Sequence, residues 1–264
     1  MLGGIDIDAL TGENDDRIDH VVLRPRAPFR LDLTAWALRR RKRNQIDRWD
    51  GTYRRALLAG DRAVTVEIEQ CGGPDDPCLI IRSLTGGFRS AEERHSIETQ
   101  LVRMLGTNID LGGFYALADE DALVGPLADR LRGVKPPRFP SLFEALVNAI
   151  ANQQLSLEVG IELLNRITER FGEHPADGHG LIAFPEPAAV LGGSIHDLRE
   201  LGFSMRKAEY VMDCAHAVLT GAIDEATLEV ADRATATDLL TGLRGIGRWS
   251  AEYVVLRGLG SIDV

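Results

Sequence analysis

The stretch of sequence that decides the fold is LRGIGRWSAEY, residues 243–253. Gly245 and Gly247 flank one apolar residue, Ile246, and a helical pattern starts directly after them. Glycine allows a tight reversal of the backbone and lets another chain approach it closely. Ile246 is expected to point inward and fix the turn, while the start of the next helix offers unpaired N–H groups that suit an anion. The pattern predicts an anion-binding helical hairpin, and a packing turn without a ligand is the alternative.

Helices are predicted throughout the sequence between this hairpin and a Pro-rich segment at residues 133–140. Apolar residues recur at helical spacing, and serines stand where helices would begin. The predicted helices cover residues 142–152, 155–171, 187–191, 195–201, 205–219, 236–243 and 247–258. Their short connections are typical of an all-α domain.

The first half of the chain shows the alternation of β-branched and polar residues that is typical of strands. Strands are predicted at residues 20–23, 29–33, 53–58, 63–70 and 78–84. One helix is predicted at residues 90–105, with a capping box formed by Ser90 and Glu93, and Ser141 with Glu144 repeats that motif.

These patterns predict an α+β fold class: an N-terminal antiparallel β-sheet with helices, followed by an all-α domain that is incomplete at its C-terminus. The expected segments are an acidic disordered tail at residues 1–17, a mixed α/β domain at residues 18–135 and the helical domain at residues 136–264. No apolar run is long enough to span a bilayer, and the acidic start does not resemble a signal peptide, so we expect a cytoplasmic protein.

The formal net charge of −10 argues against a nucleic-acid partner. Residues 233–264 differ, with four arginines against three carboxylates. Any nucleic-acid binding there must rely on backbone amides as well as on charge. The basic run at residues 39–43 is expected to be a solvated face, with a secondary phosphate contact as the alternative.

The three cysteines, Cys71, Cys78 and Cys214, are too few for a disulfide framework. Cys71 and Cys78 flank a turn rich in Gly, Pro and Asp, so they could approach each other across a hairpin. Two reduced core thiols are the expectation.

Three stretches, at residues 136–156, 198–218 and 243–264, resemble the helix–hairpin–helix DNA glycosylase superfamily. They are most similar to its alkylation-repair branch, the enzymes like bacterial 3-methyladenine DNA glycosylase II. The resemblance implies a monomeric base-excision repair enzyme that acts on double-stranded DNA with damaged bases. It would flip an alkylated purine out of the helix and hydrolyse its N-glycosidic bond, without a cofactor or metal.

The resemblance also implies roles for individual residues. Trp249 and Tyr253 would line the base pocket, where an electron-rich ring attracts a cationic alkylated purine; core packing of both rings is the alternative. Gln154, or else Leu155, would fill the gap left by the flipped base, while capping of a helix end is the other interpretation of that loop. The residues expected to contact the DNA backbone are Arg244, Gly245, Ile246, Gly247, Arg248 and Ser250.

Position 249 distinguishes the branches of the superfamily. Relatives with lyase activity hold a nucleophilic lysine there, which forms a Schiff base with the sugar. Trp249 cannot do so, and the resemblance therefore implies an enzyme without strand cleavage. An oxidised-base glycosylase–lyase is correspondingly disfavoured.

The resemblance implies no catalytic residue within these 264 residues, because the expected aspartate would lie just beyond Val264. In the relatives, a non-catalytic aspartate stands shortly before the catalytic one, and Asp263 matches that earlier aspartate. A non-catalytic DNA-binding protein that keeps the hairpin is therefore the alternative function. Release of free base separates the two.

Overall fold

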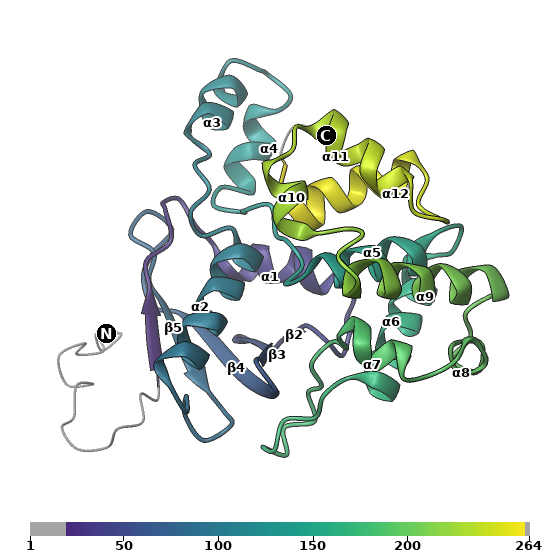
Figure 1. Cartoon of the computed structure of the whole chain (residues 1–264). Coiled ribbons are helices and arrows are strands. Elements are labelled where there is room, and N and C mark those ends of the chain that lie inside the picture. The colour runs from purple at the N-terminus through teal and green to yellow at the C-terminus, as the bar shows by residue number, and fades with distance from the viewer. Residues whose placement is uncertain (1–19, 262–264) are drawn as a thin grey trace.

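The computed structural model of the chain describes residues 20–261 (Figure 1). A five-stranded antiparallel sheet is followed by a helical half, and the predicted α+β fold class is confirmed. The predicted tail at residues 1–17 and the Asp263 match lie outside the described residues.

The sheet has the strand order β1-β5-β4-β3-β2, with antiparallel pairing throughout. Its strands are β1 (His20–Leu23), β2 (Arg48–Trp49), β3 (Tyr53–Ala59), β4 (Arg62–Gln70) and β5 (Leu79–Ser83). Alternate residues of β4, Val64, Val66 and Ile68, point to one face and are fully buried. Helix α2 (Ala91–Leu105) packs on that face through apolar residues one turn apart, such as Ile97 and Leu101.

The strand predicted at residues 29–33 is wrong, because helix α1 (Leu31–Arg39) begins there. Leu31, Ala35 and Leu38 are spaced by four and three residues, and all three are buried in the same core as the sheet. A short apolar run fits both periods, and packing against the sheet decides for the helix.

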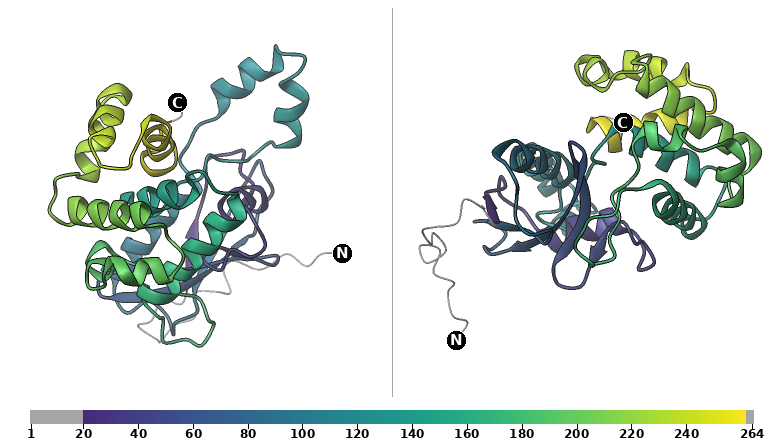
Figure 2. Two further views of the ribbon diagram at one scale, coloured as in Figure 1. Left: turned by 90° about the vertical axis from the view of Figure 1, so that its right-hand side faces the viewer. Right: turned by 60° about the horizontal axis from the view of Figure 1, so that its bottom comes forward.

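Two helices that the sequence did not indicate, α3 (Gly112–Asp119) and α4 (Gly125–Arg130), link the two halves. Figure 2 shows them as an arm that projects from the rest of the molecule. Their residues are mostly exposed; the buried residue is Ala118 in α3 and Ala128 in α4.

The helical half is built around α5 (Leu142–Asn152), in which residues 142–151 are all buried. Around it lie α6 (Leu157–Phe171), α7 (Pro187–Leu191), α8 (Ile195–Glu200), α9 (Met205–Leu219), α10 (Glu225–Val230), α11 (Arg233–Thr241) and α12 (Arg248–Val254). A π-helical turn, η2 (Val255–Leu259), continues α12. Among the described residues, no helix is long and apolar enough to cross a membrane.

A buried ion cluster of Asp47, Tyr53, Arg55 and Glu144 joins the two halves. The Arg55 guanidinium donates to Asp47 at 2.7 Å and to Glu144 at 2.5 Å, and the Tyr53 hydroxyl donates to Asp47 at 2.6 Å. Burial alone would raise the pKa of Asp47, but Arg55 and Tyr53 hold it below its usual value. Burial raises the pKa of Glu144 against the effect of Arg55. The predicted domain boundary between residues 135 and 136 stays a prediction. The buried ion cluster has members on both sides of this boundary.

The predicted capping boxes form only in part. Ser90 and Ser141 each accept the expected backbone N–H bond, from Glu93 and Glu144. The carboxylate of Glu144 turns instead to Arg55, and that of Glu93 accepts from Arg62 and the Arg89 backbone. The guanidinium groups of Arg55 and Arg62 thus replace the N-cap N–H groups as donors to these carboxylates.

The expectation of two reduced thiols is wrong for Cys71 and Cys78, which form a disulfide. Strands β4 and β5 pair Gln70 with Leu79, so the next residues on each strand face each other across the hairpin. The Cys71 N–H donates to the Cys78 carbonyl at 2.8 Å. Cys214 is a buried free thiol, as expected.

Candidate nucleic-acid interface

The predicted hairpin connects α11 to α12, and its two glycines serve different purposes. Gly245 has a φ of +88°, and a Cβ there would overlap the Tyr210 ring. Gly247 has an extended backbone and nothing within 4 Å of the place where a Cβ would lie. Ile246 between them is only 3% exposed and joins the helical core, as its predicted inward position requires. Gly245 is therefore needed for the fold, while Gly247 leaves open space beside the backbone.

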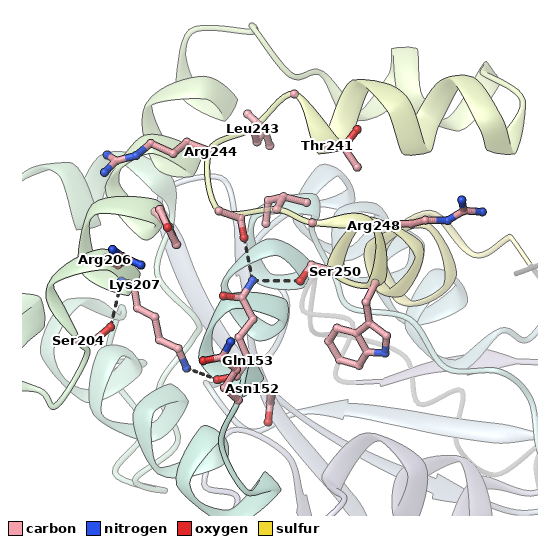
Figure 3. Close-up of a pocket in the computed structure, with 17 residues that line it drawn as sticks. Asn152, Gln153, Ser204, Arg206, Lys207, Thr241, Leu243, Arg244, Arg248 and Ser250 are labelled. Atoms are coloured by element: carbon pink, nitrogen blue, oxygen red, sulfur yellow. Dashed lines mark hydrogen bonds between the residues drawn. The ribbon is translucent and has the colours of Figure 1, made fainter.

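Hydrogen bonds fix the hairpin against the end of α5 and the start of α9. The Gln153 side-chain amide donates to the Gly245 carbonyl at 2.8 Å and to the Ser250 hydroxyl at 3.0 Å (Figure 3). The Lys207 ammonium donates to the Ala151 and Gln153 carbonyls at 2.9 and 2.8 Å. Burial lowers the pKa of Lys207. Sequence reasoning missed Gln153 and Lys207, whose partners lie more than fifty residues away.

The hairpin faces a hollow of about 1020 Å³. Its lining includes four cationic side chains and no carboxylate, although the chain as a whole is acidic. The cations are Arg206, Lys207, Arg244 and Arg248. The hollow therefore has the local charge that suits an anion, and it answers the objection from net charge.

The two hairpin arginines point to opposite sides of the turn (Figure 3). Arg244 pairs with Glu209 and with Asp213, and its guanidinium lies 5.4 Å from the centre of the Tyr210 ring. Arg248 donates to Glu252 at 3.0 Å and is otherwise exposed. Much of their charge is thus balanced within the protein.

Ser250 is only 3% exposed, and its hydroxyl is occupied by Gln153. A contact from Ser250 to a ligand would therefore come from its backbone N–H. The first-turn N–H groups of α12 have no acceptor within the helix. The open donors of this turn are thus backbone groups, as the sequence analysis anticipated.

Trp249 and Tyr253 form a stacked pair on one face of α12. Their ring centres are 5.6 Å apart and the planes differ by 12°. Trp249 is 62% exposed, so it is not the core aromatic of the alternative interpretation. Tyr253 is half-buried and also contacts the Phe139 ring. The pair offers an open aromatic surface to a flat ligand.

Arg40 belongs to the surroundings of this pair, a position that no local sequence pattern indicated. Its guanidinium donates to the Asn148 side chain at 2.8 Å and lies 3.5 Å from the Tyr253 hydroxyl. Its φ of +58° turns it back from the end of α1 toward α5 and α12. The solvated face expected for residues 39–43 is therefore wrong for Arg40.

The turn between α5 and α6 presents both candidates for the wedge. Gln154 has a φ of +53° and is exposed, and Leu155 is 42% exposed. Asn152 bonds back to the Asn148 carbonyl, and Gln153 bonds to the hairpin. These hydrogen bonds occupy the side chains of Asn152 and Gln153. They leave the side chains of Gln154 and Leu155 free to contact a ligand.

With this geometry in place, the chain can be compared with known proteins. Residues 147–253 match the model of the HhH-GPD superfamily base excision DNA repair protein. We call residues 147–253 the HhH-GPD segment, after the family whose model they match. The HhH-GPD segment runs from α5 to α12 and includes the wedge turn, the hairpin and the aromatic pair.

Curated relatives of the HhH-GPD segment are alkylation-repair glycosylases. DNA-3-methyladenine glycosylase of Bacillus subtilis is 30% identical over 151 residues, which are 57% of this chain and 50% of that protein. DNA-3-methyladenine glycosylase 2 of Escherichia coli is 31% identical over 141 residues, 53% of this chain and 49% of that protein. The chain spans about half the length of the curated relatives it matches.

A solved structure extends the likeness to the sheet. The 3-methyladenine DNA-glycosylase from Archaeoglobus fulgidus has a TM-score of 0.75 and 26% identity, over 91% of this chain and 80% of that one. The N-terminal sheet and the HhH-GPD segment therefore occur together in a relative. Within residues 20–261, no group of three His, Cys, Asp or Glu side chains is placed to hold a metal.

Proposed function

We propose that this protein is a monofunctional DNA glycosylase that removes alkylated purines of the 3-methyladenine type from double-stranded DNA. The observation that carries the proposal is the exposed Trp249, stacked on Tyr253 one turn after the hairpin. The names of the relatives of the HhH-GPD segment support the same substrate class.

The aromatic pair would select the damaged base by its charge. An alkylated purine carries positive charge, and an indole face attracts a cation by about 0.5–2 kcal/mol. The exposed face of Trp249 is available for this contact, and Tyr253 supports it from behind. The base would reach this surface by flipping out of the helix, while Gln154 or Leu155 fills the gap.

The hairpin would hold the duplex without reading its sequence. Backbone N–H groups of this turn, such as those of Gly247 and Ser250, would donate to a phosphate in the open space beside Gly247, with Arg244 and Arg248 nearby. Ile246 would act by pinning the turn. Contacts of this kind suit an enzyme that must search all sequences for damage.

The chemical step would be attack of water on the sugar carbon, since Trp249 offers no amine for a Schiff base. A carboxylate that stabilises the positive sugar is needed in such a reaction. We assign no catalytic residue within residues 20–261. We also infer a cytoplasmic monomer, which size-exclusion chromatography and cell fractionation would check.

The experiment is incubation of the purified chain with methylated duplex DNA, followed by chromatography of the released bases. We expect free 3-methyladenine and 7-methylguanine, and intact strands until abasic sites are cleaved by alkali. Such release would place the catalytic carboxylate within these 264 residues, contrary to what the resemblance implies. Trp249→Ala should reduce release at least tenfold. Binding to a duplex with an abasic-site analogue, without any base release, would favour the non-catalytic hairpin protein. Covalent trapping by borohydride would favour a lyase.

A further inference from the structure

A second cationic surface lies apart from the hairpin, between α6 and the loop that follows α1. This basic groove has a volume of about 690 Å³. Its lining carries five cations, Arg39, Lys42, Arg43, Arg48 and Arg166, and two carboxylates, Asp50 and Glu162. Such an excess is unusual in a chain with a net charge of −10.

Of the five groove cations, only Arg166 is paired with one of the two groove carboxylates. Asp50 pairs with Arg54 at 2.6 Å, and Glu162 pairs with Arg166 at 3.1 Å. Lys42 and Arg43 are exposed, and among residues 20–261 their side chains have neither an ion pair nor a hydrogen bond.

Arg39 and Arg48 turn inward to backbone carbonyls. Arg39 donates to Trp49 at 3.2 Å, and Arg48 donates to Gly180 at 2.7 Å. Neither forms an ion pair with a carboxylate of the described residues. The groove therefore keeps uncompensated positive charge.

The backbone of the loop is held in place, so its cations are presented from a fixed position. The Asn165 side chain accepts from the Gln45 N–H at 3.0 Å and donates to the Arg43 carbonyl at 2.8 Å. Asn165 is only 7% exposed. Asn44 bonds to the Arg39 carbonyl and to Asp47 of the buried ion cluster. A fixed loop loses little entropy when it binds a ligand.

The basic groove is connected to the proposed lesion site in two ways. Arg40, in the same loop, contacts Asn148 and faces Tyr253. Helix α6 begins one residue after Ser156 in the wedge turn and carries Arg166 into the groove. Ten residues at 1.5 Å each place Arg166 about 15 Å from the wedge turn along the helix.

We propose that the basic groove binds the phosphate backbone of the same DNA duplex, about four nucleotides from the flipped base. The spacing takes α6 to lie along the duplex, so that about 15 Å of helix spans about four steps of about 3.4 Å per nucleotide of a strand. The inference rests on the proposed function, because it takes the lesion site as its origin. It gives the acidic protein a second, sequence-independent contact that lengthens its footprint.

The test measures binding to a 25-base-pair duplex with a central abasic-site analogue, by fluorescence anisotropy across a range of salt concentrations. The variant is Lys42→Gln/Arg43→Gln, and the matched control, Arg130→Gln/Arg199→Gln, removes two exposed cations elsewhere. Loss of two phosphate contacts should reduce the salt slope by about 1.8 and weaken binding roughly tenfold at low salt. The control should leave the slope unchanged.

A second arm locates the contact. Duplexes with neutral methylphosphonate linkages near the fourth phosphate from the lesion should weaken binding of the wild type and leave that of the Lys42→Gln/Arg43→Gln variant unchanged. Equal losses in both proteins, or an unchanged slope in the variant, would overturn the inference while the proposed function stands. Wild-type protein without affinity for the duplex would overturn both. If the Lys42→Gln/Arg43→Gln variant loses affinity for single-stranded RNA but keeps its affinity for the duplex, RNA would replace DNA as the partner of the basic groove.

Discussion

The buried ion cluster and the hairpin contain similar polar groups, but those of the cluster bond within the protein and those of the hairpin are open to a ligand. In the cluster, Arg55 and its carboxylates are inaccessible, and each charge faces a partner of opposite sign. In the hairpin, Gly247 borders open space and Trp249 stands exposed. Groups that are satisfied inside the protein stabilise it, whereas groups left open can bind. Substitutions in the cluster should thus change stability, and those in the hairpin should change binding.

The largest effect is expected for Arg55→Met. Removal of the guanidinium leaves Asp47 and Glu144 buried without a counter-charge, and the free energy of unfolding should fall by about 3–5 kcal/mol. Urea denaturation measures it. Arg54→Met, which also loses two ion pairs but from a side chain that is 31% exposed, is the matched control and should cost about 1 kcal/mol or less. Similar losses for both variants would contradict the comparison.

The two glycines test the hairpin from within. Gly245→Ala should lower the free energy of unfolding by about 2–4 kcal/mol, because φ is +88° and the methyl group meets the Tyr210 ring. Gly247→Ala should cost at most about 1 kcal/mol, since its backbone is extended and the space is open.

The effect of Gly247→Ala on duplex affinity should be large, in contrast to its small effect on the free energy of unfolding. In Gly247→Ala the added methyl group should block close approach of a phosphate and weaken duplex affinity at least tenfold. Urea denaturation and anisotropy on both proteins separate the effects. If Gly247→Ala binds DNA like the wild type, the open space beside the backbone has no role in recognition.

The free thiol of the helical core gives a test by pH. Burial, with a further contribution from Asp213, raises the pKa of Cys214 from 9.0 to about 12. The folded state then retains a proton that the unfolded state loses, so stability is complete below pH 9 and declines as the pH rises toward 12. At pH 10.5 the loss is about 2 kcal/mol. Urea titrations at pH 8 and 10.5 should show a smaller loss in Cys214→Ala than in the wild type; equal losses would refute the assignment.

The smallest effect on stability is expected for Trp249→Ala, because the ring is 62% exposed; the change should stay within about 0.5–1 kcal/mol. Base release should nevertheless fall at least tenfold, since stacking on an aromatic ring contributes about 1–3 kcal/mol per base. Trp36→Ala is the matched control, a tryptophan of α1 that is 65% exposed, and it should leave release unchanged. A stable, fully active Trp249→Ala protein would remove the aromatic pair from the proposed site.

Local patterns were sufficient for most of the helical half. Ser141 and Ser204 cap helices whose observed bounds, Leu142–Asn152 and Met205–Leu219, equal the predicted ones. The strand predicted at residues 29–33 was wrong, because five alternating apolar and polar residues fit a strand as well as the first turn of a helix. The arm of α3 and α4 was not predicted because both helices are short and begin with glycines, Gly112, Gly113 and Gly125, which disfavour a helix.

The candidate site was predicted only as far as it is contiguous in sequence. The hairpin, the aromatic pair and the wedge turn each lie within one short stretch, and helical spacing alone brings Trp249 and Tyr253 together. Arg40 could not be foreseen, because its partners stand 108 and 213 residues away. Only the tertiary fold, which places the end of α1 beside α5 and α12, brings these residues into contact.

The sequence by itself determined most helices of the helical half, the glycine turn and the shared helix face of Trp249 and Tyr253, because these depend on backbone geometry and on neighbours within one or two turns. Tertiary structure alone decided where the charges act. It buried Arg55 between Asp47 and Glu144, paired Arg244 with Glu209, and left Lys42 and Arg43 without a partner among the described residues. The physical reason is that an ion pair depends on distance in space, which sequence separation does not specify.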